Sequence, residues 1–123
     1  IASMAEKYVL LIDESKFYDT LPLKDSVTLE VIPQSRNYVQ AQIEKLGGKA
    51  VMRKSGAKAD FVISDNGNIM DTDFSNVATF AGKPEELHKK LKQLTGVVET
   101  ALFIDMVAFA LCVCGDEVKV IEK

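Results

Sequence analysis

Residues 7–17 read KYVLLIDESKF, in which five consecutive apolar residues, 8–12, are followed directly by four polar ones. An apolar run of this length without polar alternation is typical of a strand buried on both faces, as in parallel sheets covered by helices. In open α/β sheets, ligands bind at the carboxyl ends of the strands. Lys16 is therefore either a ligand-binding residue or the polar start of a loop.

The composition of the chain fits one soluble globular protein. Of its 123 residues, 47% are hydrophobic and 27% are charged, and the net charge is -3. A negative chain without a block of lysine and arginine lacks the basic footprint of nucleic-acid binding. No apolar run approaches the roughly 18 residues that a membrane span needs. We therefore expect neither a nucleic-acid partner nor a membrane.

The two cysteines, Cys112 and Cys114, lie in the segment ALCVCG. A strand there would point both side chains to one face. A disulfide between residues i and i+2 is strained, and a C-x-C pair without further ligands is a poor zinc site. We expect buried free thiols in a reducing compartment, the cytoplasm, and no metal.

The first seven residues, IASMAEK, include neither an initiator methionine nor a signal peptide. Their composition is typical of the last two turns of a helix whose beginning is absent. We interpret the chain as a fragment of a longer protein.

The middle of the chain alternates between strand and helix patterns. Period-two alternation predicts a strand over 27–31, and an apolar stripe ending at Gly47 predicts a helix over 35–46. A short strand is expected over 49–54. Asn66-Gly67 favours a type I′ hairpin turn. Pro84 begins a second predicted helix that ends at Gly96, and residues 97–104 and 107–114 are predicted strands. The apolar positions behind these assignments are Val27, Leu29, Val31, Val39, Ile43, Leu46, Leu87, Leu91 and Leu94.

Between residues 27 and 104 the predicted order is strand, helix, strand, hairpin, helix, strand. This is the βαββαβ pattern of a ferredoxin-like (α+β) module, an antiparallel sheet with both helices on one face. The strands outside it, at 8–12 and 107–114, are apolar on both faces. They are predicted to belong to a different, parallel sheet that the ferredoxin-like module interrupts.

Five segments carry a resemblance to a known family: IASMAEKYVLLIDESK, LEVIPQS, LGGKAVMR, SDNGNIMDTDF and LTGVVETALFI. In this order they resemble the C-terminal part of A-type ribose-5-phosphate isomerases. The resemblance implies an aldose-ketose isomerase, an intramolecular oxidoreductase that interconverts D-ribose 5-phosphate and D-ribulose 5-phosphate through an enediolate in the non-oxidative pentose phosphate pathway. It implies no cofactor and no metal, and a cytoplasmic homodimer or homotetramer.

The resemblance also implies a domain division. Residues 1–24 and 106–123 would be remnants of a Rossmann-like catalytic domain of the α/β class. Residues 25–105 would form the ferredoxin-like small domain, which acts in assembly or as a lid.

Most of the family's site residues have no counterpart in the 123 residues. The Gly-Thr-Gly-Ser-Thr type phosphate loop, the Asp-Gly-Ala-Asp segment and the Lys-Gly-Gly-Gly segment are missing, and the glutamate base would fall just upstream of Ile1. The resemblance therefore implies no catalytic residue within this chain. It implies one substrate-binding residue, Lys16, in the strand-end D-x-S-K pattern, and a chain that is inactive alone.

Lysine at that place fits the chemistry of the reaction. Negative charge develops on a sugar oxygen in the enediolate, and the phosphate already carries nearly two charges. A lysine ammonium is a compact charge that can meet either group. Asp13 and Glu14 beside it could orient Lys16, although carboxylates at loop starts are usually solvated.

Several other polar residues have plainer interpretations. Residues 65–68 are explained by a turn, and Asp71 and Asp73 alternate in a strand and are predicted to face solvent. His88, the only histidine, has no neighbouring pattern of a triad or metal site, and the lysines around it fit a solvated helix face.

Two other classes of function stay open at this stage. A non-catalytic ferredoxin-like regulatory or assembly module would fit residues 27–104 but leaves the outer apolar strands unexplained. Another sugar-phosphate-binding protein of the same wider fold, such as a deaminase or a sugar-sensing regulator, would share the strand and the lysine.

Overall fold

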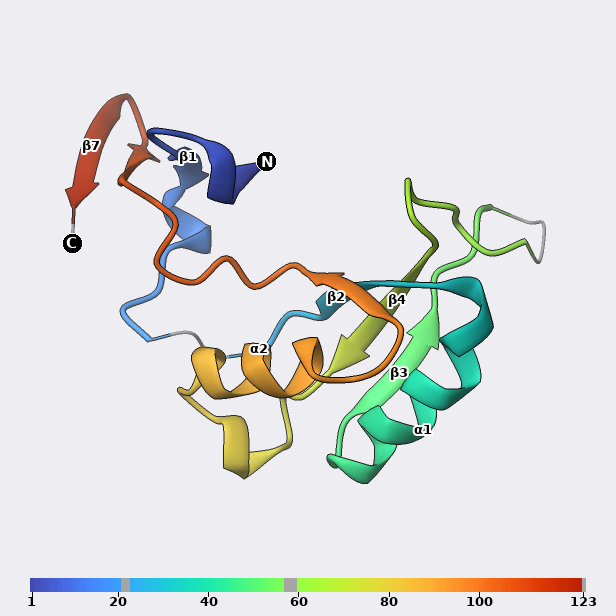
Figure 1. Cartoon of the computed structure of the whole chain (residues 1–123). Helices are drawn as coiled ribbons and strands as arrows, with labels where there is room; N and C mark the ends of the chain where they lie inside the picture. Colours follow the sequence, from blue (N-terminus) through green and yellow to red (C-terminus); the bar gives the residue numbers. More distant parts are fainter. Residues whose placement is uncertain (21–22, 57–59, 123) are drawn as a thin grey trace. The chain divides into compact units, whose positions relative to one another are not determined.

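The structure is a computed structural model that describes residues 1–20, 23–56 and 60–122. It is a mixed α/β chain with two sheets, divided into two compact units. The first unit contains residues 1–20 and 103–122, and the second contains the described residues between 23 and 102. Figure 1 shows the elements of each unit.

The sheet of the second unit has four strands: β2 (Val27–Val31), β3 (Lys49–Met52), β4 (Asn68–Asp73) and β5 (Val97–Thr100). Their order in space is β3-β4-β2-β5, and each neighbouring pair is antiparallel. The helix α1 (Arg36–Lys45) connects β2 to β3, and α2 (Pro84–Lys92) precedes β5. Two short 3-10 helices, η3 (Pro33–Ser35) and η4 (Ala78–Phe80), complete the unit.

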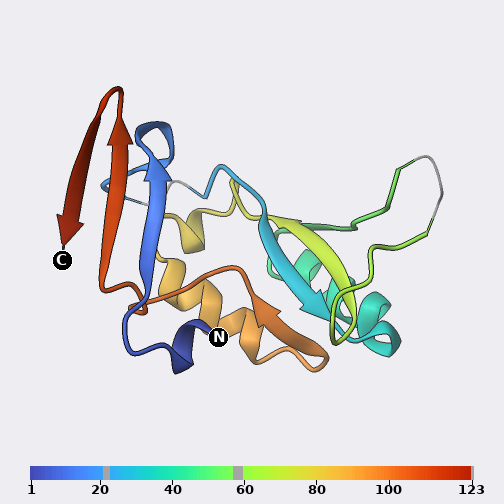
Figure 2. The same cartoon turned by 90° about the horizontal axis from the view of Figure 1, so that it is seen from above.

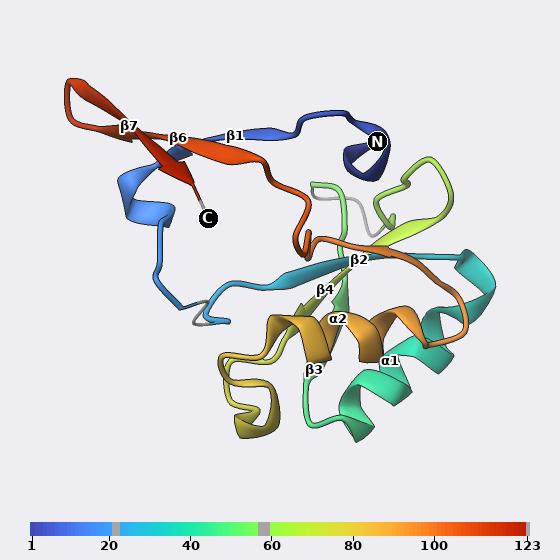
Figure 3. The ribbon, with the colours of Figure 1, turned by 60° about the vertical axis from the view of Figure 1, so that its left-hand side comes forward.

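Both long helices lie on one face of this sheet, as Figure 3 shows. Alternate residues of β2 are buried on that face, and Leu29 pairs with Met70 of β4. Phe74 and Phe80 meet edge to face with ring centroids 5.7 Å apart. The core is therefore one continuous layer between sheet and helices, made by Leu23, Val27, Leu29, Val31, Val39, Ile43, Ala50, Met70, Phe74, Phe80, Leu87 and Leu91.

The predicted stop of α1 before Gly47 and the predicted start of α2 at Pro84 are confirmed, whereas α2 ends at Lys92 and not at the predicted Gly96. Helix α1 ends at Lys45. Gly47 follows it with a φ of 90°, in the left-handed region, and the Gly48 amide donates to the Ile43 carbonyl at 3.1 Å. Helix α2 begins at Pro84, and Glu85 and Glu86 occupy its first turn, where the helix dipole favours negative charge.

The first unit contains a three-stranded sheet of β1 (Val9–Asp13), β6 (Phe109–Cys114) and β7 (Glu117–Glu122). The order is β1-β6-β7; β1 is parallel to β6, and β6 is antiparallel to β7. Figure 2 shows the three strands side by side. The 3-10 helices η1 (Ala2–Met4) and η2 (Glu14–Lys16) flank β1.

The predicted strand at residues 8–12 forms, but its burial differs from the prediction. Leu11 is 77% exposed and Val9 is 37% exposed, while Leu10 and Ile12 on the other face are half-buried. Among the described residues, nothing covers the face that carries Leu11. The apolar pattern identified the strand correctly but not its environment in this chain.

Three further predictions of element bounds were wrong. The first seven residues form only the three-residue η1, since Ile1–Met4 bury nothing that would stabilise a longer helix. The strand predicted over 97–104 ends at Thr100. The Ala101 amide still donates to the Thr28 carbonyl at 2.9 Å, and the next amide, that of Leu102, donates to the Thr100 hydroxyl at 3.2 Å and not to β2. The strand expected over 49–54 ends at Met52.

The turn at Asn66-Gly67 is not type I′, which needs positive φ at both central residues. Neither residue has positive φ. The Ser64 amide donates to the Gly67 carbonyl at 2.8 Å, and Gly67 packs directly on the Val31 carbonyl, where a side chain would overlap. Glycine is required here by close backbone contact.

Candidate functional site

Lys16 lies at the carboxyl end of β1, as its sequence position predicts. Asp13, the last residue of β1, accepts the Ser15 amide at 2.9 Å, and the Phe17 amide donates to the Glu14 carbonyl at 3.2 Å. These two bonds close the η2 turn, a local arrangement that Asp often forms with the residue two places on. They place Lys16 immediately beyond the strand end, with its side chain exposed.

Asp13 acts on the backbone of this turn. Its pKa lies below the usual range, chiefly because its carboxylate accepts hydrogen bonds from Ser15, with a smaller contribution from the charge of Lys16. Within the described part of the chain, Lys16 forms no ion pair. Its ammonium is therefore available to an anion at the strand end.

The neighbouring parallel strand brings two thiols to the same end of the sheet. Asp13 is paired with Val113 of β6, and Cys112 and Cys114 flank that residue. Their Sγ atoms are 3.6 Å apart and neither forms a disulfide. The hydrogen bond with Cys112, and then partial burial, raise the pKa of the Cys114 thiol. The prediction that both thiols share one face is confirmed, although only Cys112 is fully buried.

The second unit contains a polar cluster that sequence reasoning missed. Arg53 donates twice to Asp71, from Nη2 to Oδ1 at 2.6 Å and from Nε to Oδ2 at 2.9 Å. Thr28 donates to the same carboxylate at 3.0 Å, and the hydrogen bonds from Arg53 hold the pKa of Asp71 below its usual range. The cluster ties β2, β4 and the segment after β3 together. The sequence predicted only that Asp71 faces solvent, and it did not predict that the Asp71 carboxylate accepts hydrogen bonds from Arg53 and Thr28.

His88 serves the packing of α2 on β5. Its Nδ1 lies 2.8 Å from the Thr100 hydroxyl, which is buried. The part of the chain that the structure describes contains no group of three or more His, Cys, Asp or Glu side chains arranged to hold a metal ion. Among the same residues, no helix has the length and apolarity required to cross a lipid bilayer.

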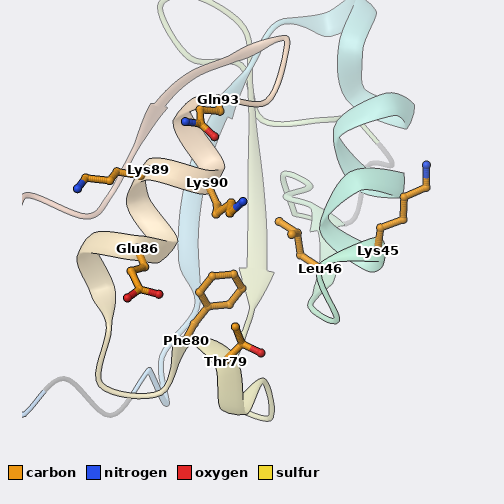
Figure 4. A pocket seen from close by; sticks show the side chains of 8 residues that line it. All are labelled: Lys45, Leu46, Thr79, Phe80, Glu86, Lys89, Lys90 and Gln93. Carbon is orange, nitrogen blue, oxygen red and sulfur yellow. The ribbon is translucent and has the colours of Figure 1, made fainter.

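A cavity of about 500 Å³ opens between the end of α1, η4 and α2, with Phe80 and Leu46 supplying its apolar part. Figure 4 shows the side chains of Lys45 and Lys89 extending away from each other and from the cavity. Glu86 also lines the cavity, and its carboxylate would repel a phosphate. The lysines therefore do not converge on one point, and this cavity lacks the arrangement that would clamp a phosphate.

Fold and strand end together define a class: a mixed α/β protein with an exposed lysine at the carboxyl end of a parallel strand, without an ion-pair partner among the described residues. Residues 1–117 match the family model described as ribose 5-phosphate isomerase A (phosphoriboisomerase A). The chain belongs to this family.

Relatives and solved structures agree with the family match. The chain is 37% identical over 123 residues to a ribose-5-phosphate isomerase of Meyerozyma guilliermondii, covering 95% of this chain and 47% of that protein. The solved ribose 5-phosphate isomerase A of Methanocaldococcus jannaschii is 34% identical and superposes with a TM-score of 0.83, covering 97% of this chain and 51% of that one.

A second solved structure, a D-ribose-5-phosphate isomerase in complex with phospho-erythronic acid, is 31% identical with a TM-score of 0.86. It covers 100% of this chain and 52% of that one. The chain spans about half the length of the curated relatives it matches.

Proposed function

We propose that this chain forms part of a ribose-5-phosphate isomerase that interconverts D-ribose 5-phosphate and D-ribulose 5-phosphate in the pentose phosphate pathway. The observation that carries the proposal is the position of Lys16 at the carboxyl end of β1, in a chain whose first 117 residues match the family. A solved relative bound to phospho-erythronic acid supports a sugar-phosphate ligand.

Lys16 has a defined role in this proposal. Proton transfer between adjacent carbons of the sugar passes through an enediolate, so negative charge grows on a sugar oxygen. An exposed ammonium without an ion-pair partner among the described residues can contact this oxygen or the phosphate. Contact with the developing charge accelerates the reaction, since only interactions that strengthen in the transition state do so.

Asp13 is a positioning residue in the same proposal. Its carboxylate is already engaged by the Ser15 amide, so it fixes the η2 turn from which Lys16 projects. Glu14 forms the backbone part of that turn through its carbonyl.

The presence of two sheets supports the domain assignment that we propose. We propose that residues 25–105 are a ferredoxin-like small domain acting in assembly or as a lid, supported by the strand order β3-β4-β2-β5 with both helices on one face. Residues 1–24 and 106–123 are proposed to belong to a Rossmann-like catalytic domain, supported by the parallel pairing of β1 with β6.

The reaction needs a base and a phosphate loop that the family resemblance does not match to any of these 123 residues. We therefore propose that residues 1–123 are inactive by themselves. The whole enzyme is proposed to be a cytoplasmic homodimer or homotetramer that uses no cofactor.

A chimera tests this function. Residues 1–123 replace the matching segment of the Meyerozyma guilliermondii enzyme, and ribulose 5-phosphate formation is measured beside residues 1–123 alone. We expect turnover from the chimera and none above background from the chain alone. A folded chimera, shown by circular dichroism, that lacks turnover contradicts the isomerase assignment, and turnover by the purified chain alone contradicts its proposed inactivity.

A further inference from the structure

Strand β6 presents two thiols to one face of the three-stranded sheet. The Sγ atoms of Cys112 and Cys114 are 3.6 Å apart, and both are free. Cys112 is only 3% exposed, whereas Cys114 is half-buried and reachable from solvent. Opposite Cys112 in the ladders lie Ile12 on β1 and Lys119 on β7. The pair therefore has a buried thiol, a reachable thiol, and an apolar neighbour on the same face.

A direct disulfide suits this pair poorly. Residues i and i+2 of a strand have Cα atoms about 6.7 Å apart, at the upper end of the range that disulfides span. Bond formation would also bring the sulfurs to about 2.0 Å. The β6 backbone, paired on both sides with β1 and β7, resists the shortening that this requires.

A zinc site is incomplete here. Tetrahedral zinc with Zn–S bonds of about 2.3 Å holds two ligand sulfurs about 3.8 Å apart, close to the observed separation. Structural zinc nevertheless needs four protein ligands, and the described residues offer no third His, Cys, Asp or Glu in the group. The geometry therefore fits a soft acceptor that is satisfied by two sulfurs from the protein.

We propose that Cys112 and Cys114 form a dithiol site for trivalent arsenicals, in which one arsenic atom bridges the two sulfurs. With an organoarsenic oxide, both S–H bonds and the As–O bonds break, two S–As bonds form, and the oxygen leaves with the two protons as water. Arsenic stays trivalent, so the reaction needs neither oxidant nor reductant. The bridging atom lets the sulfurs stay near their present separation, which a disulfide does not.

The order of the two bonds follows from burial. The half-buried Cys114 thiol reacts first, and Cys112 then closes the ring from within the same face. Because the second bond is intramolecular, the dithiol should bind more tightly than either thiol by about 10²- to 10⁴-fold. Neither the strand pairing nor the η2 turn has to open.

The test uses residues 1–123 and phenylarsine oxide as the probe, in an excess of 2-mercaptoethanol that competes with single thiols. Native mass spectrometry should show one adduct per chain, thiol titration should show both cysteines consumed, and 2,3-dimercaptopropanol should remove the adduct. Binding to the folded chain should also raise its melting temperature.

A matched variant moves one thiol to the opposite face while keeping two cysteines: Val113→Cys combined with Cys114→Val. Adjacent strand residues point to opposite faces, so this variant should lose the adduct at probe concentrations at least about 100-fold above those that saturate the parent. Cys114→Ala, at a half-buried position that tolerates truncation, should lose it equally.

Three results would overturn the proposal. The first is a face-swapped variant that binds the probe as tightly as the parent does. The second is a parent adduct in which one of the two thiols can still be titrated. The third is a melting temperature lowered by the probe, which means that the unfolded chain is the form that binds.

Discussion

Leu29 and Leu11 each occupy the third position of a five-residue strand, β2 and β1, yet one is 0% and the other 77% exposed. The difference lies in what covers each strand. Both α1 and α2 pack on the face of β2 that carries Leu29, and the other face of β2 bears Thr28 and Glu30.

Strand β1 is apolar on both faces, and the described residues of its unit contain no helix longer than three residues. The exposed apolar side chains of this sheet are Val9, Leu11, Val113, Val118 and Val120. The comparison teaches that the second unit holds a closed core of its own, whereas the first unit presents a strand end and one uncovered apolar face. The closed hydrophobic core and the candidate binding residue, Lys16, thus lie in different units.

The largest expected effect concerns the two leucines themselves. Leu29→Ala removes a fully buried side chain and should lower the free energy of unfolding by about 2–5 kcal/mol. Leu11→Ala should change it by less than about 0.5 kcal/mol, because that side chain is already in water. Urea unfolding followed by circular dichroism measures both. Equal costs for the two substitutions would break the contrast between the units.

A second pair compares two glycines, each replaced by asparagine. Gly67→Asn drives a side chain into the Val31 carbonyl and should destabilise the chain by about 1–3 kcal/mol. Gly115, with a φ of 62° and open space around it, lies in the left-handed region that asparagine tolerates, so Gly115→Asn should be close to neutral. Thermal melts of both variants decide this, and a costly Gly115→Asn with a harmless Gly67→Asn would contradict the packing described.

The smallest effect is the pH dependence of the Arg53–Asp71 pair in the second unit. Because Arg53 holds the pKa of Asp71 below its unfolded value of about 3.9, the pair stabilises the fold above that pH and loses its contribution as the pH falls through the lower folded pKa. The Arg53 side chain is 45% exposed, so solvent screening limits the contribution to about 0.5–1 kcal/mol.

Asp71→Asn should therefore flatten the fall in stability below about pH 4. Arg53→Met should flatten it equally, and the double substitution should add little to either, since both remove the same interaction. Unfolding free energies between pH 2 and pH 7 measure the three variants. Parallel curves for Asp71→Asn and the parent would show that the pair contributes nothing.

Much of this architecture could be predicted from local patterns. Alternation located β2, the apolar stripes and Gly47 located α1, and the run at residues 8–12 located β1 with Lys16 at its carboxyl end. The D-x-S spacing that closes the η2 turn is also local, although its hydrogen bond was not predicted.

The features that sequence reasoning missed depend on contacts between distant residues. The pairing of Arg53 with Asp71 requires the register of β3 against β4, and the shape of the turn at Gly67 depends on its contact with Val31. The end of β5 is an exception, since it involves a local hydrogen bond from the Leu102 amide to the Thr100 hydroxyl, two residues apart, that strand propensity does not encode. The exposure of Leu11 depends on which elements cover β1, which no pattern within β1 reveals.

The most direct test of the central proposal is the kinetics of Lys16→Ala in the chimera with the Meyerozyma guilliermondii enzyme. Lys7→Ala is the matched control, because Lys7 is an exposed lysine just before the amino end of the same strand. Loss of a charge-assisted contact at the transition state raises the activation free energy by about 2–4 kcal/mol, so Lys16→Ala should lower kcat/KM by roughly 30- to 1000-fold.

The kcat/KM of Lys7→Ala should stay within about twofold of that of the parent. The free energy of unfolding of both variants should lie within about 0.5 kcal/mol of the parent's, since neither side chain is buried. An unchanged kcat/KM for Lys16→Ala, in a chimera that folds and turns over substrate, would contradict the assignment of Lys16 to the sugar phosphate.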